Sequence, residues 1–178
     1  MNTYNKKTMR AIKINYIKFS FSSSYPSLNF IESNFIKKRS IFIGSIYNEN
    51  KNYRCTLMKN LCFVNFTGVK STKEILKITK KYCELANVTV KSKIKIDSIF
   101  STVNNVFINV NDFDKLNKNV KQNNGYLKIF PSFSGIYFKF NDNEGCGIYF
   151  KKSKKLNLFG QKHISNILKF VNLVSSFT

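Results

Sequence analysis

The chain repeats itself, and this repetition constrains the fold more than any other feature. The pattern Ile-Lys-Ile-x-x-Ile occurs at 12–17 and again at 94–99. Two later pairs of segments match in the same order: Thr56–Lys59 with Ile148–Lys151, and Phe66–Lys70 with Leu158–Lys162. The last pair shares Gly-x-Lys. Several matches in one order indicate two copies of one structural unit.

The repeat divides the chain into three parts. We expect a short N-terminal extension at 1–11, a first repeat at 12–90 and a second repeat at 91–178. The length fits one domain, or two small halves, with enough chain to bury a core.

Each repeat has the same predicted order of elements. A strand rich in β-branched and aromatic residues comes first, at Ile12–Phe21 and Ile94–Phe107. A short helix follows. Pro26 can take its first position after Ser24 or Tyr25 in one copy, and Asn111-Asp112 is its cap in the other. Three or four strands come next: Ser40–Tyr47, Tyr53–Met58 and Leu61–Thr67, then Gly135–Phe140, Gly147–Lys151 and Leu156–Phe159. Their turns are Lys59-Asn60 and Ser153-Lys154.

A longer helix ends each repeat, at Ser71–Asn87 and Gln161–Phe177. Apolar residues recur in both at three- and four-residue steps, and Ser71 with Glu74 forms a capping box. The predicted fold class is therefore α+β. Two pseudo-symmetric repeats would form an antiparallel sheet with its helices on one face and its other face open.

Strand alternation predicts which side chains lie on the open face. Near each Gly-x-Lys these are apolar or short polar residues: Thr56, Met58, Asn65, Thr67, Ile148, Phe150, Asn157 and Phe159. We expect this face to carry no charge. Such a face framed by lysines suits the minor groove of DNA, where small polar groups meet base-edge acceptors and apolar side chains enter base steps. A second core face buried by another subunit fits the pattern equally well.

The net positive charge of the chain limits the classes of partner that it is expected to bind. The chain has 30 Lys and Arg against 9 Asp and Glu, a formal net charge of +21. A polyanion, either nucleic acid or an anionic membrane surface, is the expected partner. One histidine and few acids offer little for acid–base chemistry, and no paired carboxylates, nucleophile elbow or Gly-rich phosphate loop occur. We therefore expect no catalytic residues, no cofactor and no small-molecule substrate.

The four cysteines have no metal-ligand spacing and are expected to be reduced thiols, with no metal site. No apolar run is long enough to span a bilayer and no signal-peptide core is present, so we expect an intracellular protein without a membrane partner.

The repeated order of elements resembles the TATA-binding protein core from about Ile12 to Phe177. The residues that carry the resemblance are Phe66–Ser71, Phe133–Lys139 and Leu158–Lys162. The resemblance implies one curved, saddle-shaped antiparallel sheet with helices on its convex face. It also implies binding to the minor groove of an AT-rich promoter, with kinking of the DNA.

Site residues follow from the same resemblance. The family's four wedging phenylalanines fall on Ile41, Met58, Phe133 and Phe150. Its groove-facing positions fall on Tyr16, Thr56, Asn65, Thr67, Ser98, Phe100, Ile148, Asn157 and Phe159. Neither central asparagine of the first strands is kept, because these positions are Tyr16 and Ser98, although Asn15 lies one place away. The family's phosphate-binding positions are matched by Arg39, Lys70, Lys139, Lys155 and Lys162.

The implied partners are double-stranded DNA, general transcription factors and the RNA polymerase machinery, in the nucleus or in a viral transcription compartment. The acidic stretch that meets general transcription factor IIB in the family is here Ile129–Ser132, which has no acid. Two alternatives remain open. One is a sheet-based binder of single-stranded RNA that uses its aromatic residues for stacking, and the other is a protein-interaction module of this fold without DNA binding.

Overall fold

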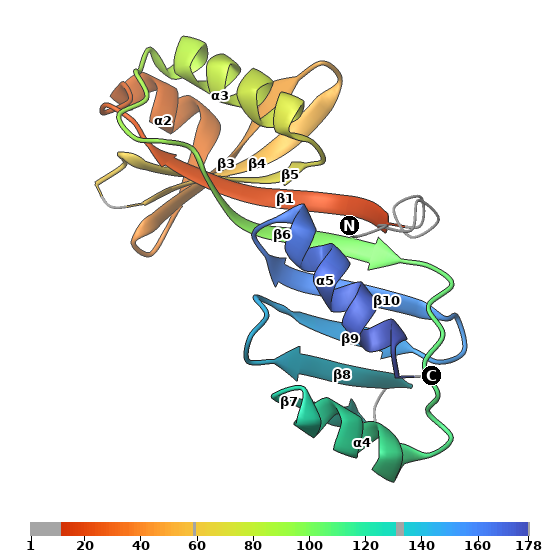
Figure 1. Cartoon of the computed structure of the whole chain (residues 1–178). Coiled ribbons are helices and arrows are strands. Elements are labelled where there is room, and N and C mark those ends of the chain that lie inside the picture. The colour runs from red at the N-terminus through yellow and green to blue at the C-terminus, as the bar shows by residue number, and fades with distance from the viewer. Residues whose placement is uncertain (1–11, 59, 131–133, 178) are drawn as a thin grey trace. The chain divides into compact units, whose positions relative to one another are not determined.

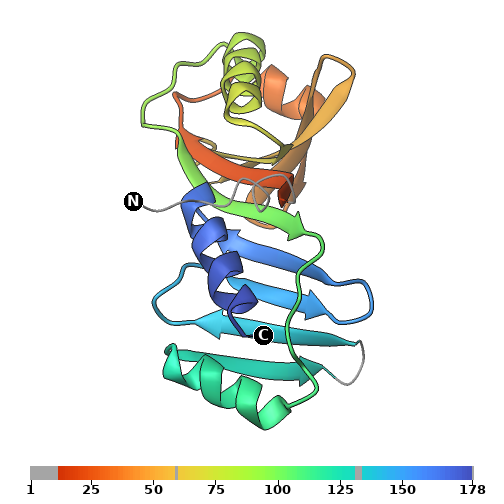
Figure 2. The ribbon, with the colours of Figure 1, turned by 45° about the vertical axis from the view of Figure 1, so that its right-hand side comes forward.

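The computed structural model describes residues 12–58, 60–130 and 134–177. It divides into two compact units (Figures 1 and 2). The first unit is Tyr16–Asp97. The second unit runs from Ser98 to the C-terminus and also takes in the chain up to Asn15. Each unit has the same design, five antiparallel strands with helices on one face.

The first unit orders its strands β2-β3-β4-β5-β1. Their bounds are β1 Ile12–Ser22, β2 Phe35–Lys38, β3 Ile41–Asn48, β4 Lys51–Met58 and β5 Phe63–Val69. Helices α2 (Leu28–Asn34) and α3 (Thr72–Ala86) lie on the same face of these strands (Figure 1).

An aromatic cluster forms the core between this sheet and α3. Phe19, Phe21 and Phe66 are stacked and fully buried, and the ring of Tyr82 on α3 meets Phe66 edge-on at 5.8 Å. Burial of such rings supplies most of the stabilisation, since each removes a large apolar area from water. The core thus fixes which face of the sheet is covered.

The second unit orders its strands β6-β10-β9-β8-β7. Their bounds are β6 Lys95–Val103, β7 Gly125–Phe130, β8 Gly135–Phe140, β9 Cys146–Phe150 and β10 Lys155–Gln161. Helix α5 (Ile164–Ser175) lies across this sheet, and α4 (Phe113–Gln122) lies beside β7 (Figures 1 and 2). Phe138, Phe140 and Phe170 are fully buried between α5 and the strands.

The repeated Gly-x-Lys marks a repeated irregularity in the sheet. Ile17 pairs with Val69 and Lys18 with Thr67, so Gly68 is the extra residue of a bulge. The register shifts in the same way between Leu158 and Gln161, around Gly160. Both glycines have positive φ, +103° and +75°, a conformation that side chains with a Cβ rarely adopt. Each of the two strands, β5 and β10, therefore ends one residue after the glycine, before the long helix begins.

Most predicted elements are confirmed, including the α+β class and, among the described residues, antiparallel strands with helices on one face. Ser71 caps α3 as predicted, and Asp112 caps α4. Two strands, β2 and β7, were not among those named from sequence.

Several predicted boundaries are wrong. Ser27, and not a residue before Pro26, caps α2. β6 ends at Val103, because an irregular segment rather than a strand leads on to Phe107. α5 begins at Ile164, since β10 continues to Gln161. β5 begins at Phe63, because Asn60 and Leu61 have positive φ in a turn.

Candidate nucleic-acid interface

The open face of the first unit is hollowed. A depression of about 260 Å³ is lined by eight residues of β1, β3, β4 and β5: Lys18, Ile41, Ile43, Arg54, Thr56, Met58, Asn65 and Thr67. Thr56 lies directly opposite Asn65 in the ladder, as alternation predicts. The structure therefore brings together the predicted wedge residues Ile41 and Met58 with three predicted groove residues.

The expectation of an uncharged face is wrong for this unit. Lys18 and Arg54 both line the depression. In the ladders, Lys18 and Arg54 both lie directly opposite Thr67, on its two sides. Cations that line an apolar hollow favour an anionic ligand more strongly than a neutral lining would.

The open face of the second unit has the same layout with more aromatic residues. Asn157 lies opposite Ile148 in the ladder, and Phe150 opposite Lys155. Phe100 and Phe159 stack with ring centroids 4.7 Å apart. Tyr126, Phe130 and Tyr137 add a second aromatic group, with the Tyr126 and Tyr137 rings 5.8 Å apart. Tyr126 is exposed and the other rings are half-buried, so all of them present apolar surface on the face that the helices leave open.

Short polar side chains are linked on these faces. In the second unit Asn15 Nδ2 donates to Thr102 Oγ1 at 2.8 Å, and Thr102 Oγ1 donates to Asn157 Oδ1 at 2.9 Å. In the first unit Ser20 Oγ donates to Asp97 Oδ1 at 3.0 Å. Asn15, Thr102, Ser20 and Asp97 were not among the predicted site residues. The sequence signal that could have identified them is the repeat itself, because Asn15 and Asp97 occupy the same place in Ile-Lys-Ile-(Asn/Asp).

Two further predicted site residues, Tyr16 and Ser98, are not among those that line the depression. Tyr16 is 41% exposed and is not among the residues that line the depression. Ser98 is half-buried in β6, next to Asp97. Phe133 lies outside the described residues.

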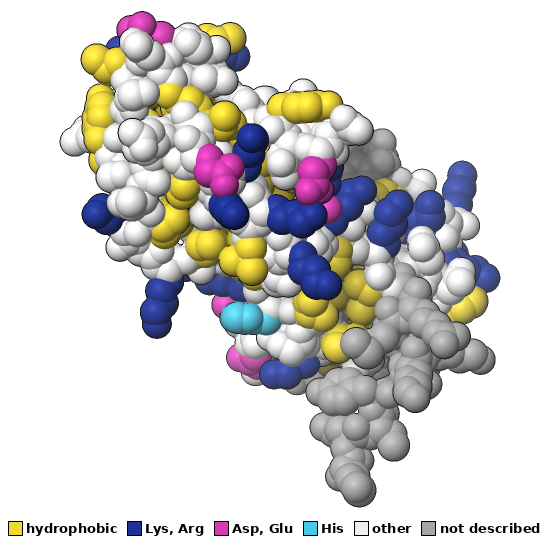
Figure 3. All heavy atoms as spheres, turned by 90° about the horizontal axis from the view of Figure 1, so that it is seen from above, with side chains coloured by type: hydrophobic (Ala, Val, Ile, Leu, Met, Phe, Trp, Pro, Cys, Tyr) yellow, Lys and Arg dark blue, Asp and Glu magenta, His cyan; other side chains and the backbone are white. Residues whose placement is uncertain are grey.

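The predicted phosphate-binding residues are at the surface, but some already have partners. Arg39, Lys70 and Lys155 are exposed. Lys139 Nζ donates to the backbone carbonyl of Gly145 at 2.9 Å. Lys162 forms an ion pair with Glu144. In the view of Figure 3, Lys and Arg side chains are spread over the face shown, some beside acidic ones.

Two glutamates have lowered pKa values for the same physical reason. Desolvation raises the pKa of Glu144, but the charge and hydrogen bonds of Lys162 outweigh this effect. Desolvation likewise opposes the change at Glu74, where hydrogen bonds from the Lys70 backbone N–H and Lys51 Nζ lower the pKa. Both carboxylates are therefore charged at neutral pH and hold lysines near the Gly-x-Lys segments.

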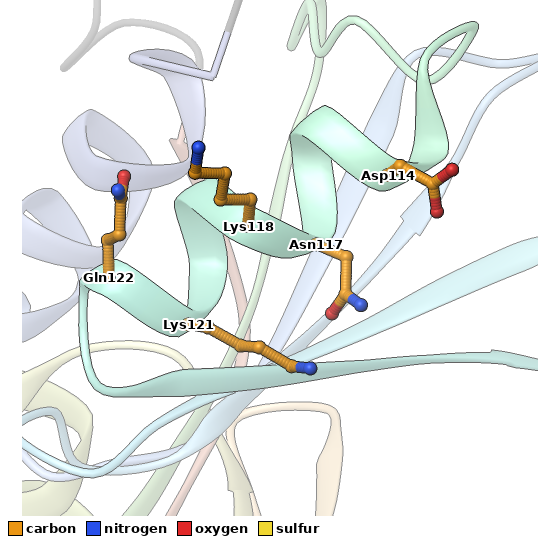
Figure 4. Close-up of a pocket in the computed structure, with 5 residues that line it drawn as sticks. All are labelled: Asp114, Asn117, Lys118, Lys121 and Gln122. Carbon is orange, nitrogen blue, oxygen red and sulfur yellow. The ribbon is translucent and has the colours of Figure 1, made fainter.

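Another hollow, of about 500 Å³, lies elsewhere and is lined by Asp114, Asn117, Lys118, Lys121 and Gln122, all from α4 (Figure 4). None of these residues belongs to an open face, so this hollow adds nothing to the interface.

We also searched residues 12–58, 60–130 and 134–177 for metal ligands, disulfides and membrane-spanning helices. In these segments no group of three or more His, Cys, Asp or Glu side chains could hold a metal ion. All four cysteines are free, and burial raises the pKa of the Cys55 thiol. Within the same segments no helix is long and apolar enough to cross a membrane.

Comparison with known proteins places the fold. No family model and no curated protein matches the sequence. Among solved structures, the TBP (TATA-binding protein) of Methanococcus jannaschii matches with a TM-score of 0.69 and 18% identity. The match covers 93% of this chain and 98% of that one. At this identity the likeness shows the fold alone: the chain has a TBP-like fold.

Proposed function

We propose that the chain is a TATA-binding-protein-like transcription initiation factor that binds and bends AT-rich duplex DNA through the minor groove, without catalysis. The observation that carries the proposal is the depression on the open face of the first unit. Its lining combines apolar side chains that can enter base steps, one amide and two hydroxyls that can meet base edges, and two cations.

The charge and the fold support the same function. A net charge of +21 supplies the attraction to phosphates that dominates affinity for DNA. The likeness to TBP of Methanococcus jannaschii adds a neighbour whose name states TATA binding. We further propose that general transcription factors and the polymerase machinery are its partners, in a nucleus or a viral transcription compartment. Because Ile129–Ser132 has no acid, contact with general transcription factor IIB would need other residues.

A gel shift at fixed salt tests the proposal with AT-rich duplex, GC-rich duplex and single-stranded RNA. We expect the AT-rich duplex to bind most tightly. Thr56→Glu should abolish this binding, because it places a carboxylate inside the depression. Thr72→Glu is the matched control, since it adds the same charge at an exposed position of α3, and it should still bind.

The aromatic groups of the second unit favour one other function, the binding of single-stranded RNA. Phe100 and Phe159, and the Tyr126–Tyr137 pair, could serve as platforms on which bases stack. Preference for the single strand in the same gel shift, with loss on Phe159→Ala, would support this function. No binding to any of the three probes would leave a protein-interaction module.

A further inference from the structure

The two repeats differ at one chemically important position. Asp97 follows Ile94-Lys95-Ile96 as Asn15 follows Ile12-Lys13-Ile14, and Asn65 precedes Gly68 by the same spacing as Asn157 precedes Gly160. Each unit thus has an equivalent set of three polar residues: Asn15, Thr102 and Asn157 in the second unit, and Asp97, Ser20 and Asn65 in the first. The position that carries the amide of Asn15 in the second unit's set carries the carboxylate of Asp97 in the first unit's set.

The set in the second unit leaves donors available. Asn15 donates to Thr102, and the single hydroxyl proton of Thr102 goes to the Asn157 carbonyl oxygen. The carbonyl of Asn157 is therefore satisfied from within the sheet. Among the described residues, nothing accepts a hydrogen bond from Asn157 Nδ2, so both of its protons can go to a ligand on the open face.

The set in the first unit leaves acceptors available. The single hydroxyl proton of Ser20 goes to Asp97 Oδ1, because a carboxylate can only accept. Ser20 then has no proton for Asn65, which lies directly opposite it in the ladder. Asn65 is only 7% exposed and lines the depression, and within the described part of the chain its Oδ1 has no partner. A buried acceptor without a donor is costly, so a ligand that supplies one is favoured.

The free donors of the second unit and the free acceptors of the first unit complement different base pairs in the minor groove. A·T and T·A pairs present only acceptors there, whereas G·C adds one donor, the guanine N2 amino group. The amide of Asn157 complements A·T. The carboxylate of Asp97 and the carbonyl of Asn65 would face acceptors at an A·T pair, and the guanine amino group is the donor that they lack.

We infer that the first unit recognises a G·C pair within an otherwise AT-rich site, through the guanine N2 amino group bound by Asp97 and Asn65. This inference rests on the proposed function. It adds a base preference that belongs to one half of the protein only, so the preferred site is asymmetric and gives the bound protein one orientation on the duplex.

Base analogues test the inference directly. An AT-rich duplex is scanned by replacing each A·T pair in turn with G·C, with inosine·C or with diaminopurine·T, and binding is followed by fluorescence anisotropy. Inosine lacks the minor-groove amino group of guanine, and diaminopurine adds that group to adenine. At one position we expect G·C and diaminopurine·T to raise affinity about tenfold, and inosine·C to give no gain.

Amino-acid substitutions test whether Asp97 causes the preference for the minor-groove amino group. Asp97→Asn should remove the gain at that position, because it makes the first set like the second. Asp114→Asn is the matched control, since it removes the same charge from an exposed position of α4. It should leave the base preference unchanged. Asn15→Asp should create a second position at which the amino group is favoured.

The outcomes separate the two proposals. If AT-rich duplex binds but the amino group weakens binding at every position, the inference is overturned and the proposed function stands. The inference also fails if a gain is present and Asp97→Asn leaves it intact. If none of the duplexes binds, both proposals are wrong.

Discussion

Lys162 and Glu144 form an ion pair, with 3.4 Å between Nζ and Oε1. Lys162 belongs to the second Gly-x-Lys and is a predicted phosphate-binding residue. Both side chains are partly exposed, so the pair itself contributes little to stability. The pair matters for DNA binding, because the Glu144 carboxylate competes with a DNA phosphate for Lys162.

Glu144→Gln should therefore strengthen binding to duplex DNA. We expect an affinity increase of about threefold at low salt, and a plot of log K against log salt that is steeper by up to one unit. Fluorescence anisotropy over a salt series measures both quantities. Glu84→Gln, which removes the charge paired with Lys80 on α3, is the control for the loss of an exposed ion pair away from the Gly-x-Lys segments. An equal gain in both variants would contradict a specific role for Lys162.

Lys70→Ala should weaken binding to all duplex sequences alike. Lys70 is the exposed lysine of the first Gly-x-Lys, and a phosphate contact carries no base information. If about five basic residues reach phosphates, the wild-type slope should be near −4 to −5, and the variant should be shallower by about one unit. The same salt series, run with two unrelated AT-rich duplexes, is the measurement. A loss confined to one duplex would show that Lys70 reads bases.

The strand faces could be predicted because two signals agree. Alternation placed Thr56 with Met58 and Asn65 with Thr67, and the repeat gave the same answer for Ile148 and Asn157. The ladders put Thr56 opposite Asn65 and Ile148 opposite Asn157, which brings these side chains onto one face. Burial of Phe66 and Leu158 on the other face makes any slip of register costly.

The relayed residues could not be predicted in the same way. Arg54 lies two residues before Thr56, and Lys18 lies opposite Thr67, so the two-residue period extended further along these strands would have placed both cations on the open face. The pair Lys162–Glu144 joins β10's end to a turn before β9, a contact that depends on how the turn folds. The repeat aligned Asn15 with Asp97, but only the hydrogen bonds of Thr102 and Ser20 show why that difference matters.

Glu74 should make stability depend on acidic pH. It accepts from the Lys70 N–H at 2.8 Å and from Lys51 Nζ at 3.0 Å, and its pKa is lowered in the folded state although desolvation opposes this. A lowered pKa means that the stabilisation is fully present above the unfolded value, near 4.3, and is lost as pH falls through the folded value.

Glu74→Gln should cost about 0.5–1 kcal/mol at neutral pH and progressively less below about pH 4. Urea unfolding at a series of pH values gives the difference. Glu32→Gln on the short helix α2 offers a control without an ion pair in the described structure. A difference between wild type and Glu74→Gln that stays constant down to pH 3 would contradict the assignment.

The wedge residues should bend DNA unequally. Phe150, at the end of β9, offers a flat ring that can replace lost base stacking, and Phe133 is its predicted counterpart. Ile41 and Met58 line the depression of the first unit and can fill an opened base step, but they have no aromatic face and Met is flexible. Unstacking costs a few kcal/mol per step, so the aromatic end should hold the sharper kink.

Phe150→Ala and Phe133→Ala should therefore lower both affinity and bend angle more than Ile41→Ala or Met58→Ala does. Met58→Phe should increase the bend, because it gives the first unit the ring that it lacks. Energy transfer between dyes at the two ends of a short AT-rich duplex reports the bend for each variant. Equal losses in all four alanine variants would contradict the asymmetry. An unchanged bend in every variant would mean that these side chains do not enter the base stack.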